Sequence, residues 1–265
     1  MKSILLAALA VLMLIGSVHA AEVSCARPGI PGFCDVALLR GKVVKGDYER
    51  VRSFIYFFST TKFILASPGG DVDEALKIGR LFRKHLILAD APWRKPDGSI
   101  WIYGLDRTAP CRGQNCTCAS ACAFIWFGAV ERDGTVGLHR PYIDDPMFAG
   151  LPPAEASIRY RQMLDSVVRY LNEMEVPKSI IESMTATSSG DIRWVDTIDE
   201  GLDRPPSIAE WVGASCGRGD AWMEAMRQNQ SFSQQQWQAL ERTHLKKLNC
   251  GWDLFDKHRK LTFGG

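Results

Sequence analysis

The chain has 265 residues, which is enough to bury one sizeable hydrophobic core. Its 32 Lys and Arg residues nearly balance its 30 Asp and Glu residues, so charge gives no sign of an acidic partner such as nucleic acid. A basic segment with interleaved aromatic residues is also missing from the sequence, and we predict no nucleic-acid binding.

The first 20 residues have the pattern of a signal peptide. Lys2 supplies a positive charge, an apolar run extends from Ile4 to Ile15, and Val18-His-Ala20 fits the small-x-small rule for cleavage. We therefore predict an exported protein, either periplasmic or secreted. An uncleaved membrane anchor is the less favoured alternative, because a bilayer span needs about 20 apolar residues.

The predicted elements alternate between strands and helices. In the N-terminal half we expect an irregular, disulfide-pinned arm at 21–35, an extended segment at 36–44, a helix at 48–58, a strand at 62–66, a helix at 71–86, a strand at 86–89 and a loop at 90–115 with room for a hairpin at 99–103. Further along we expect a buried helix at 119–130, a short strand that ends on His139, helices at 153–175 and 177–184, a strand at 192–195 and a Trp-rich helical extension at 205–265. The alternation over 36–204 predicts one α/β domain with a mostly parallel sheet.

Eight cysteines follow the predicted signal peptide, and an even number in an exported chain indicates disulfides. Spacing pairs Cys25 with Cys34 and Cys216 with Cys250. It leaves the connectivity of four others open, namely Cys111, Cys116, Cys118 and Cys122. Zinc binding by the last three is disfavoured, because no histidine is near them and the spacing is not Cys-x-x-Cys, so we predict no metal.

Residue types suited to acyl transfer lie at the ends of three predicted elements. Ser120 begins an apolar helix, His139 ends a strand, and a glycine pair ending at Gly70 lies between a strand and a helix. A serine hydroxyl becomes a nucleophile when a base takes its proton and donors stabilise the substrate oxyanion. We predict Ser120 as nucleophile and His139 as base, with the backbone N–H groups of Gly70 and Ala121 as oxyanion donors.

Three motifs occur in the order Ser67-Pro-Gly-Gly70, Ala119-Ser-Ala121 and Leu138-His-Arg-Pro141. In this order they resemble the Clp protease proteolytic subunit and its superfamily, which includes crotonases and signal-peptide peptidases. The resemblance covers about residues 36–203. It implies a spiral of ββα units and peptide hydrolysis by a Ser-His-Asp triad.

By position, the resemblance implies Asp191 as the third member of the triad, with Asp196 and Asp199 as fallbacks. The Ser-Lys dyad of signal-peptide peptidases is disfavoured, because no lysine lies between Lys95 and Lys178. The acyl-CoA chemistry of crotonases is not expected outside the cytoplasm.

The function predicted from the sequence is an exported serine peptidase that acts on a peptide or protein substrate. We expect no cofactor and no ATPase partner, because an exported protein has no ATP supply, and the resemblance leaves a homo-oligomer open. One alternative is a catalytically inactive protein of the same fold, used for binding or assembly in the cell envelope. Another is thiol chemistry at Cys118 or Cys122, which an even cysteine count in an oxidising compartment disfavours.

Overall fold

The computed structural model describes residues 20–26, 32–94, 99–101, 116–143, 146–228 and 230–263. Nearly all of the predicted signal peptide and Cys111 therefore lie outside the described residues. The helices are α2 (Asp47–Phe58), α3 (Val72–Lys84), α4 (Ala121–Gly128), α5 (Pro146–Ala149), α6 (Pro153–Glu173), α7 (Lys178–Ala186), α8 (Pro206–Cys216), α9 (Ala221–Arg227) and α10 (Gln234–Phe263). The strands are β1 (Glu22–Cys25), β2 (Val36–Arg40), β3 (Lys62–Ala66), β4 (Leu88–Asp90), β5 (Trp93–Arg94), β6 (Ile100–Trp101), β7 (Cys118–Ala119), β8 (Glu131–Asp133), β9 (Thr135–Leu138) and β10 (Arg193–Asp196).

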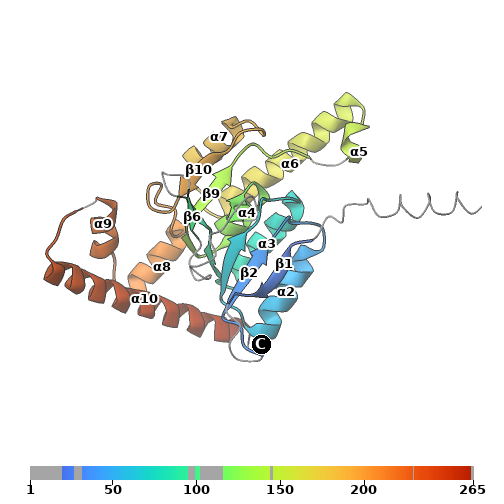
Figure 1. Ribbon diagram of the computed structural model, residues 1–265. Coiled ribbons are helices and arrows are strands. Elements are labelled where there is room, and N and C mark those ends of the chain that lie inside the picture. The colour runs from blue at the N-terminus through green and yellow to red at the C-terminus, as the bar shows by residue number, and fades with distance from the viewer. Residues whose placement is uncertain are drawn as a thin grey trace, which may run out of the picture.

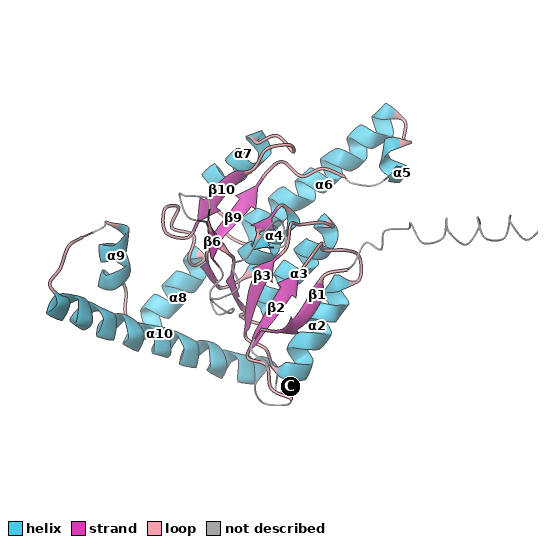
Figure 2. Cartoon of the chain, in the orientation of Figure 1, coloured by secondary structure: helices cyan, strands magenta, loops and turns pink. Residues whose placement is uncertain are grey.

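The principal sheet has the strand order β1-β2-β3-β4-β8, and β2, β3, β4 and β8 run parallel. A second sheet has the order β10-β9-β7, in which β7 and β9 are parallel and β10 is antiparallel to β9. The sheets lie at the centre of the molecule, while α5 and the start of α6 project on one side and α8 to α10 on another (Figures 1 and 2). The predicted α/β fold with a mostly parallel sheet and a helical C-terminal extension is confirmed.

The two sheets are joined where β3 ends. Ser67, one residue beyond β3, forms a parallel bridge with Cys118 of β7, and the Ala119 N–H donates to the Ser67 carbonyl at 3.1 Å. Beyond this bridge, the Asp71 carboxylate caps α3 by accepting from the Glu74 N–H at 2.9 Å. The turn into α3 is therefore held beside the turn into α4.

Helices α3 and α4 pack against each other through two glycines. A Cβ atom on Gly128 would lie 2.2 Å from the Gly79 carbonyl oxygen, so the two backbones are in direct contact. A Cβ atom on Gly79 would lie 1.8 Å from the Tyr170 hydroxyl, which donates to the Phe124 carbonyl at 2.6 Å. All eight residues of α4 are buried, as its uniformly apolar sequence predicts.

Two local predictions differ from the structure. The N-terminal arm was expected to be irregular, but Glu22–Cys25 forms β1, which is antiparallel to β2. The strand expected at 86–89 begins instead at Leu88, because Leu86 has a φ of 49° and ends α3. The Ile87 N–H donates to the Phe82 carbonyl at 3.0 Å, which is the hydrogen bond of a left-handed helix C-terminus.

The C-terminal helices form a small cluster of their own. The disulfide Cys216–Cys250 joins α8 to α10, and Phe255 is fully buried with its ring centroid 5.7 Å from that of Trp211. Arg259 joins this cluster to the rest of the molecule, since its guanidinium donates to a backbone carbonyl at the end of α3.

We predict that Gly79→Ala destabilises the protein, because the new Cβ would collide with Tyr170 and separate α3 from α4. The expected loss is about 1–3 kcal/mol in the free energy of unfolding, measured by urea denaturation. Gly213→Ala in α8 is the matched control, because its Cβ would lie 3.3 Å from the flexible side chain of Arg218, which follows that helix. It should be neutral or stabilising by up to about 1 kcal/mol. Equal stability changes in the two variants would contradict this account of the contact.

Candidate active site

A cleft of about 1270 Å³ opens where the two sheets meet. Its walls come from the turn into α3, the turn into α4, the end of β9, the middle of α6 and the start of β10. Of the site residues predicted from the sequence, Gly70, Ser120 and His139 line the cleft. Asp191 is not among the lining residues, but its neighbour Gly190 is.

Ser120 occupies a sharp turn between β7 and α4. Its backbone angles are φ 57° and ψ −128°, a combination that L-residues other than glycine rarely adopt. The turn is anchored by its own N–H, which donates to the Gly137 carbonyl at 2.9 Å. The Ser120 side chain makes no capping hydrogen bond to α4. A strained strand-to-helix turn that presents a serine hydroxyl to a cleft is a structural basis for a nucleophile.

The disulfide Cys118–Cys122 spans this turn, from two residues before Ser120 to two residues after it, and both cysteines are fully buried. Sequence spacing leaves this pairing open. The disulfide also rules out thiol chemistry at Cys118 and Cys122, because neither sulfur is a free thiol. The predicted pairings Cys25–Cys34 and Cys216–Cys250 are confirmed.

The glycine pair lies directly against the Ser120 turn. Gly69 has a φ of 102°, and a Cβ atom there would lie 2.6 Å from the Ser120 Cβ and 2.9 Å from the Ala121 nitrogen. Gly70 has a φ of 140°, and a Cβ atom there would lie 2.0 Å from a backbone carbonyl oxygen. Neither position tolerates a side chain, so the glycines are needed for both conformation and close approach.

The N–H groups of Gly70 and Ala121 are available as donors. Gly70 forms an isolated parallel bridge with Val43. The hydrogen bonds of this bridge run from the Val43 N–H to the Gly69 carbonyl and from the Asp71 N–H to the Val43 carbonyl, so the Gly70 N–H is not used there. Ala121 is the first residue of α4 and has no earlier helical carbonyl to which it could donate. Within the described residues, no hydrogen bond from either N–H is found. Two free amide donors beside a serine are the chemical requirement of an oxyanion hole.

His139 follows β9 and lies close to Ser120 because of the strand register. Ala119 of β7 pairs with Gly137 of the parallel strand β9, so Ser120 and His139 both lie just beyond the C-terminal ends of these neighbouring strands. His139 is 7 % exposed. No hydrogen bond among the described residues joins its ring to the Ser120 hydroxyl, and such contacts often tighten only when substrate binds.

The ring of His139 is oriented by backbone. Its Nδ1 lies 2.9 Å from the carbonyl oxygen of Arg140. A carbonyl oxygen only accepts, so Nδ1 carries the hydrogen and the lone pair of the neutral ring is on Nε2. This is the tautomer that a general base requires.

The β9–β10 register separates the three candidate carboxylates. Arg193 pairs with Leu138, so Asp191 lies beyond the same end of β9 as His139, although its side chain is exposed and makes no described contact with that ring. Asp196 pairs with Thr135 at the opposite end, about 13 Å away at roughly 3.3 Å per residue, and its carboxylate accepts the Asp199 N–H. Both fallback residues are therefore too far from His139.

Sequence reasoning missed two side chains of the cleft, Arg94 and Trp194. Arg94 lies in the predicted loop, outside the hairpin expected at 99–103, whereas the structure pairs β5, which contains Arg94, with β6 at Ile100–Trp101. The available signal was the alternation in the strand that ends at Val195, which places Ile192 and Trp194 on the same face. Both of these line the cleft.

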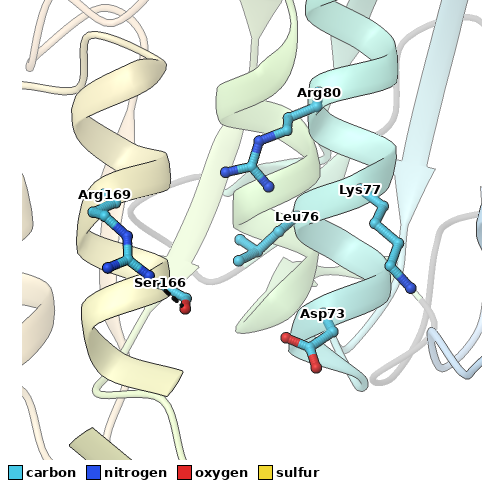
Figure 3. A pocket seen from close by; sticks show the side chains of 6 residues that line it. All are labelled: Asp73, Leu76, Lys77, Arg80, Ser166 and Arg169. Carbon is cyan, nitrogen blue, oxygen red and sulfur yellow. Dashed lines mark hydrogen bonds between the residues drawn. The ribbon is translucent and has the colours of Figure 1, made fainter. Parts of the chain in front are cut away.

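A smaller hollow of about 270 Å³ lies between α3 and α6 (Figure 3). Asp73 and Ser166 line both this hollow and the cleft. Lys77 pairs with Glu74 at 2.8 Å, Arg80 pairs with a glutamate of α6, and Arg169 donates to Ser166 Oγ at 3.1 Å. Because it shares Asp73 and Ser166 with the cleft, the hollow is an extension of the cleft rim.

Within the described ranges, no cluster of three or more His, Cys, Asp or Glu side chains is arranged to hold a metal ion. In those same ranges, no helix combines the length and apolarity needed to cross a bilayer.

No family model and no curated protein matches the chain. Among solved structures, it is similar to a mutant of ClpP1 from Listeria monocytogenes, with 14% identity over 64% of this chain and 88% of that one and a TM-score of 0.42. It is also similar to a mutant of the membrane-bound stomatin-specific protease 1510-N, with 17% identity over 69% of this chain and 84% of that one and a TM-score of 0.38.

We predict that Cys118→Ala/Cys122→Ala lowers the rate at which Ser120 reacts with a fluorophosphonate. Without the disulfide, the strained turn relaxes toward ordinary backbone angles, and about 1–3 kcal/mol of strain corresponds to a loss of roughly 5- to 150-fold in rate. The rate is measured by intact mass against time. Cys216→Ala/Cys250→Ala is the matched control and should react at the wild-type rate. Equal rates in both double variants, with folding retained by circular dichroism, would contradict a positioning role for the disulfide.

Proposed function

We propose that the protein is a serine peptidase in which Ser120 is the nucleophile and His139 is the general base. The single observation that carries this proposal is the strained Ser120 turn beside two free backbone N–H donors. A core serine in a helix needs neither of these features. The position of His139 at the adjacent strand end supplies the base that such a serine requires.

In the proposed reaction, His139 Nε2 takes the proton of the Ser120 hydroxyl while Oγ bonds to the substrate carbonyl carbon. The carbonyl electron pair moves onto oxygen, where the N–H groups of Gly70 and Ala121 donate to the resulting oxyanion. The C–N bond then breaks and the leaving amine takes the proton from His139. A water molecule attacks the acyl-enzyme in the same way, and the serine hydroxyl is regenerated.

The substrate in this proposal is a peptide. The cleft, at about 1270 Å³, is larger than a site for a drug-sized ligand, which is roughly 300–1,000 Å³, and it therefore suits an extended chain. Export is also part of the proposal and is supported by the disulfides, which persist in oxidising compartments. Hydrolysis would then proceed without an ATPase partner and without a cofactor.

Asp191 is proposed as the third member of the triad, acting on the imidazolium and not on the tautomer. The Arg140 carbonyl already holds the Nδ1 hydrogen, so Asp191 is not needed to select the basic form of His139. Its place beyond β9 allows it to stabilise the charged ring electrostatically during the reaction.

The first test is fluorophosphonate labelling of the oxidised, mature protein, read by intact mass. We expect one adduct on the wild type and none on Ser120→Ala. Ser189→Ala is the matched control, because Ser189 is an exposed serine at the cleft and lies outside the proposed machinery. A folded wild type without an adduct would reject the peptidase and support a non-catalytic protein of this fold.

The second test separates the roles of His139 and Asp191 by the labelling rate. We expect His139→Ala to lower the rate by roughly 10² or more, because the base is lost. Asp191→Asn should lower it by less than roughly tenfold, since large losses at this position come from a wrong tautomer, which the Arg140 carbonyl prevents here. Equal losses in the two variants would show that the carbonyl does not orient the ring during the reaction.

A further inference from the structure

Arg94 lines the cleft and is held there by a backbone hydrogen bond and an aromatic contact. Its backbone N–H donates to Thr135 Oγ1 at 3.2 Å, which connects β5 to the start of β9. Its guanidinium carbon lies 4.1 Å from the ring centroid of Trp194. This is a close cation–π contact, which holds the guanidinium over the indole ring.

Trp194 in turn lies against the strand pair that carries Ser120. It pairs with Gly137 across β9 and β10, and a Cβ atom on Gly137 would lie 3.0 Å both from the Trp194 ring and from the Ala119 Cβ. Ala119 is the residue before Ser120. The guanidinium of Arg94 is therefore separated from the strand that delivers the nucleophile by one aromatic ring.

Arg94 has no anionic partner in the part of the chain that the structure describes. Its Nε is buried and has no hydrogen-bond acceptor. The other arginine of the cleft, Arg159, differs because it pairs with Glu155 at 2.9 Å. Asp71 and Asp73, the carboxylates that line the cleft, form no ion pair with Arg94.

The shielded Nε is out of reach of a ligand in the cleft, so the available donors are the two terminal Nη groups, to which the described residues offer no acceptor. A guanidinium whose face is covered by an aromatic ring keeps its edge donors free and pre-oriented. That edge matches the two oxygens of a carboxylate in bidentate geometry. The arrangement suits recognition of a planar anion better than it suits packing alone.

We propose that Arg94 and Trp194 form a specificity subsite that binds a carboxylate of the peptide substrate. The carboxylate comes either from an acidic side chain or from the C-terminus of the peptide. This inference rests on the proposed peptidase, for which it names the substrate class. The subsite also makes a prediction about binding that does not require turnover.

The test is fluorescence anisotropy of labelled peptides with Ser120→Ala, which binds but cannot hydrolyse them. One peptide pair differs by an internal Glu or Gln, and a second pair differs by a C-terminal carboxylate or amide. We expect the carboxylate member of one pair to bind tighter by roughly tenfold to a hundredfold, and the pair that shows this identifies the source. Adding Arg94→Gln should abolish the preference, whereas adding Arg159→Gln should leave it unchanged.

Arg94→Lys serves as the second variant if Arg94→Gln fails to fold by circular dichroism. Lysine keeps the charge but loses the bidentate fork, so the preference should fall without reversing. No carboxylate preference in either peptide pair, or a preference that survives in the folded Arg94 variants, would overturn the subsite. An Arg94-dependent preference in a protein whose wild type is not labelled by fluorophosphonate would retain the subsite and reject hydrolysis.

Discussion

The hydrogen bond from the Ser120 N–H to the Gly137 carbonyl is the contact on which the rest of the site depends. It holds a residue with φ 57° at the point where β7 ends and α4 begins. Because Gly137 belongs to β9, the same bond sets the strand register that brings His139 to the edge of the sheet. Ser120 and His139, the proposed nucleophile and base, are therefore positioned by one backbone contact between two short parallel strands.

A strained turn persists only when its surroundings over-determine it. Here α4 is buried along its whole length and packs against α3 through Gly79 and Gly128, so the helix that follows the turn cannot shift. The disulfide Cys118–Cys122 closes the turn covalently within the same buried region. Gly69 then approaches so closely that its missing side chain leaves the cleft open beside Ser120. The contacts that pack α3 against α4 in the core therefore also hold the Ser120 turn in place.

The cleft combines apolar and aromatic side chains, such as Phe124, Ile192 and Trp194, with many polar and charged ones. Trp194 has two roles in it, because its ring covers Gly137 on the strand next to the nucleophile and also supports the guanidinium of Arg94. The proposed catalytic residues and Trp194 of the proposed carboxylate subsite are thus carried by neighbouring strands of the small sheet. The C-terminal helices, which are held by Cys216–Cys250, lie apart from this cleft and leave it accessible.

The sequence alone determined the local elements and the identities of the polar groups. The strand at Lys62–Ala66 and the buried helix after Ser120 follow from apolar periodicity, and the glycine pair follows from its place between a strand and a helix. Tertiary structure alone decided which of these meet. The β9–β10 register separated Asp191 from Asp196, the chain geometry paired Cys118 with Cys122, and β5 brought Arg94 over Trp194. The physical reason is that the periodicity of apolar residues encodes which face of a helix or strand is buried. Strand register and contacts between elements depend instead on partners far apart in the chain.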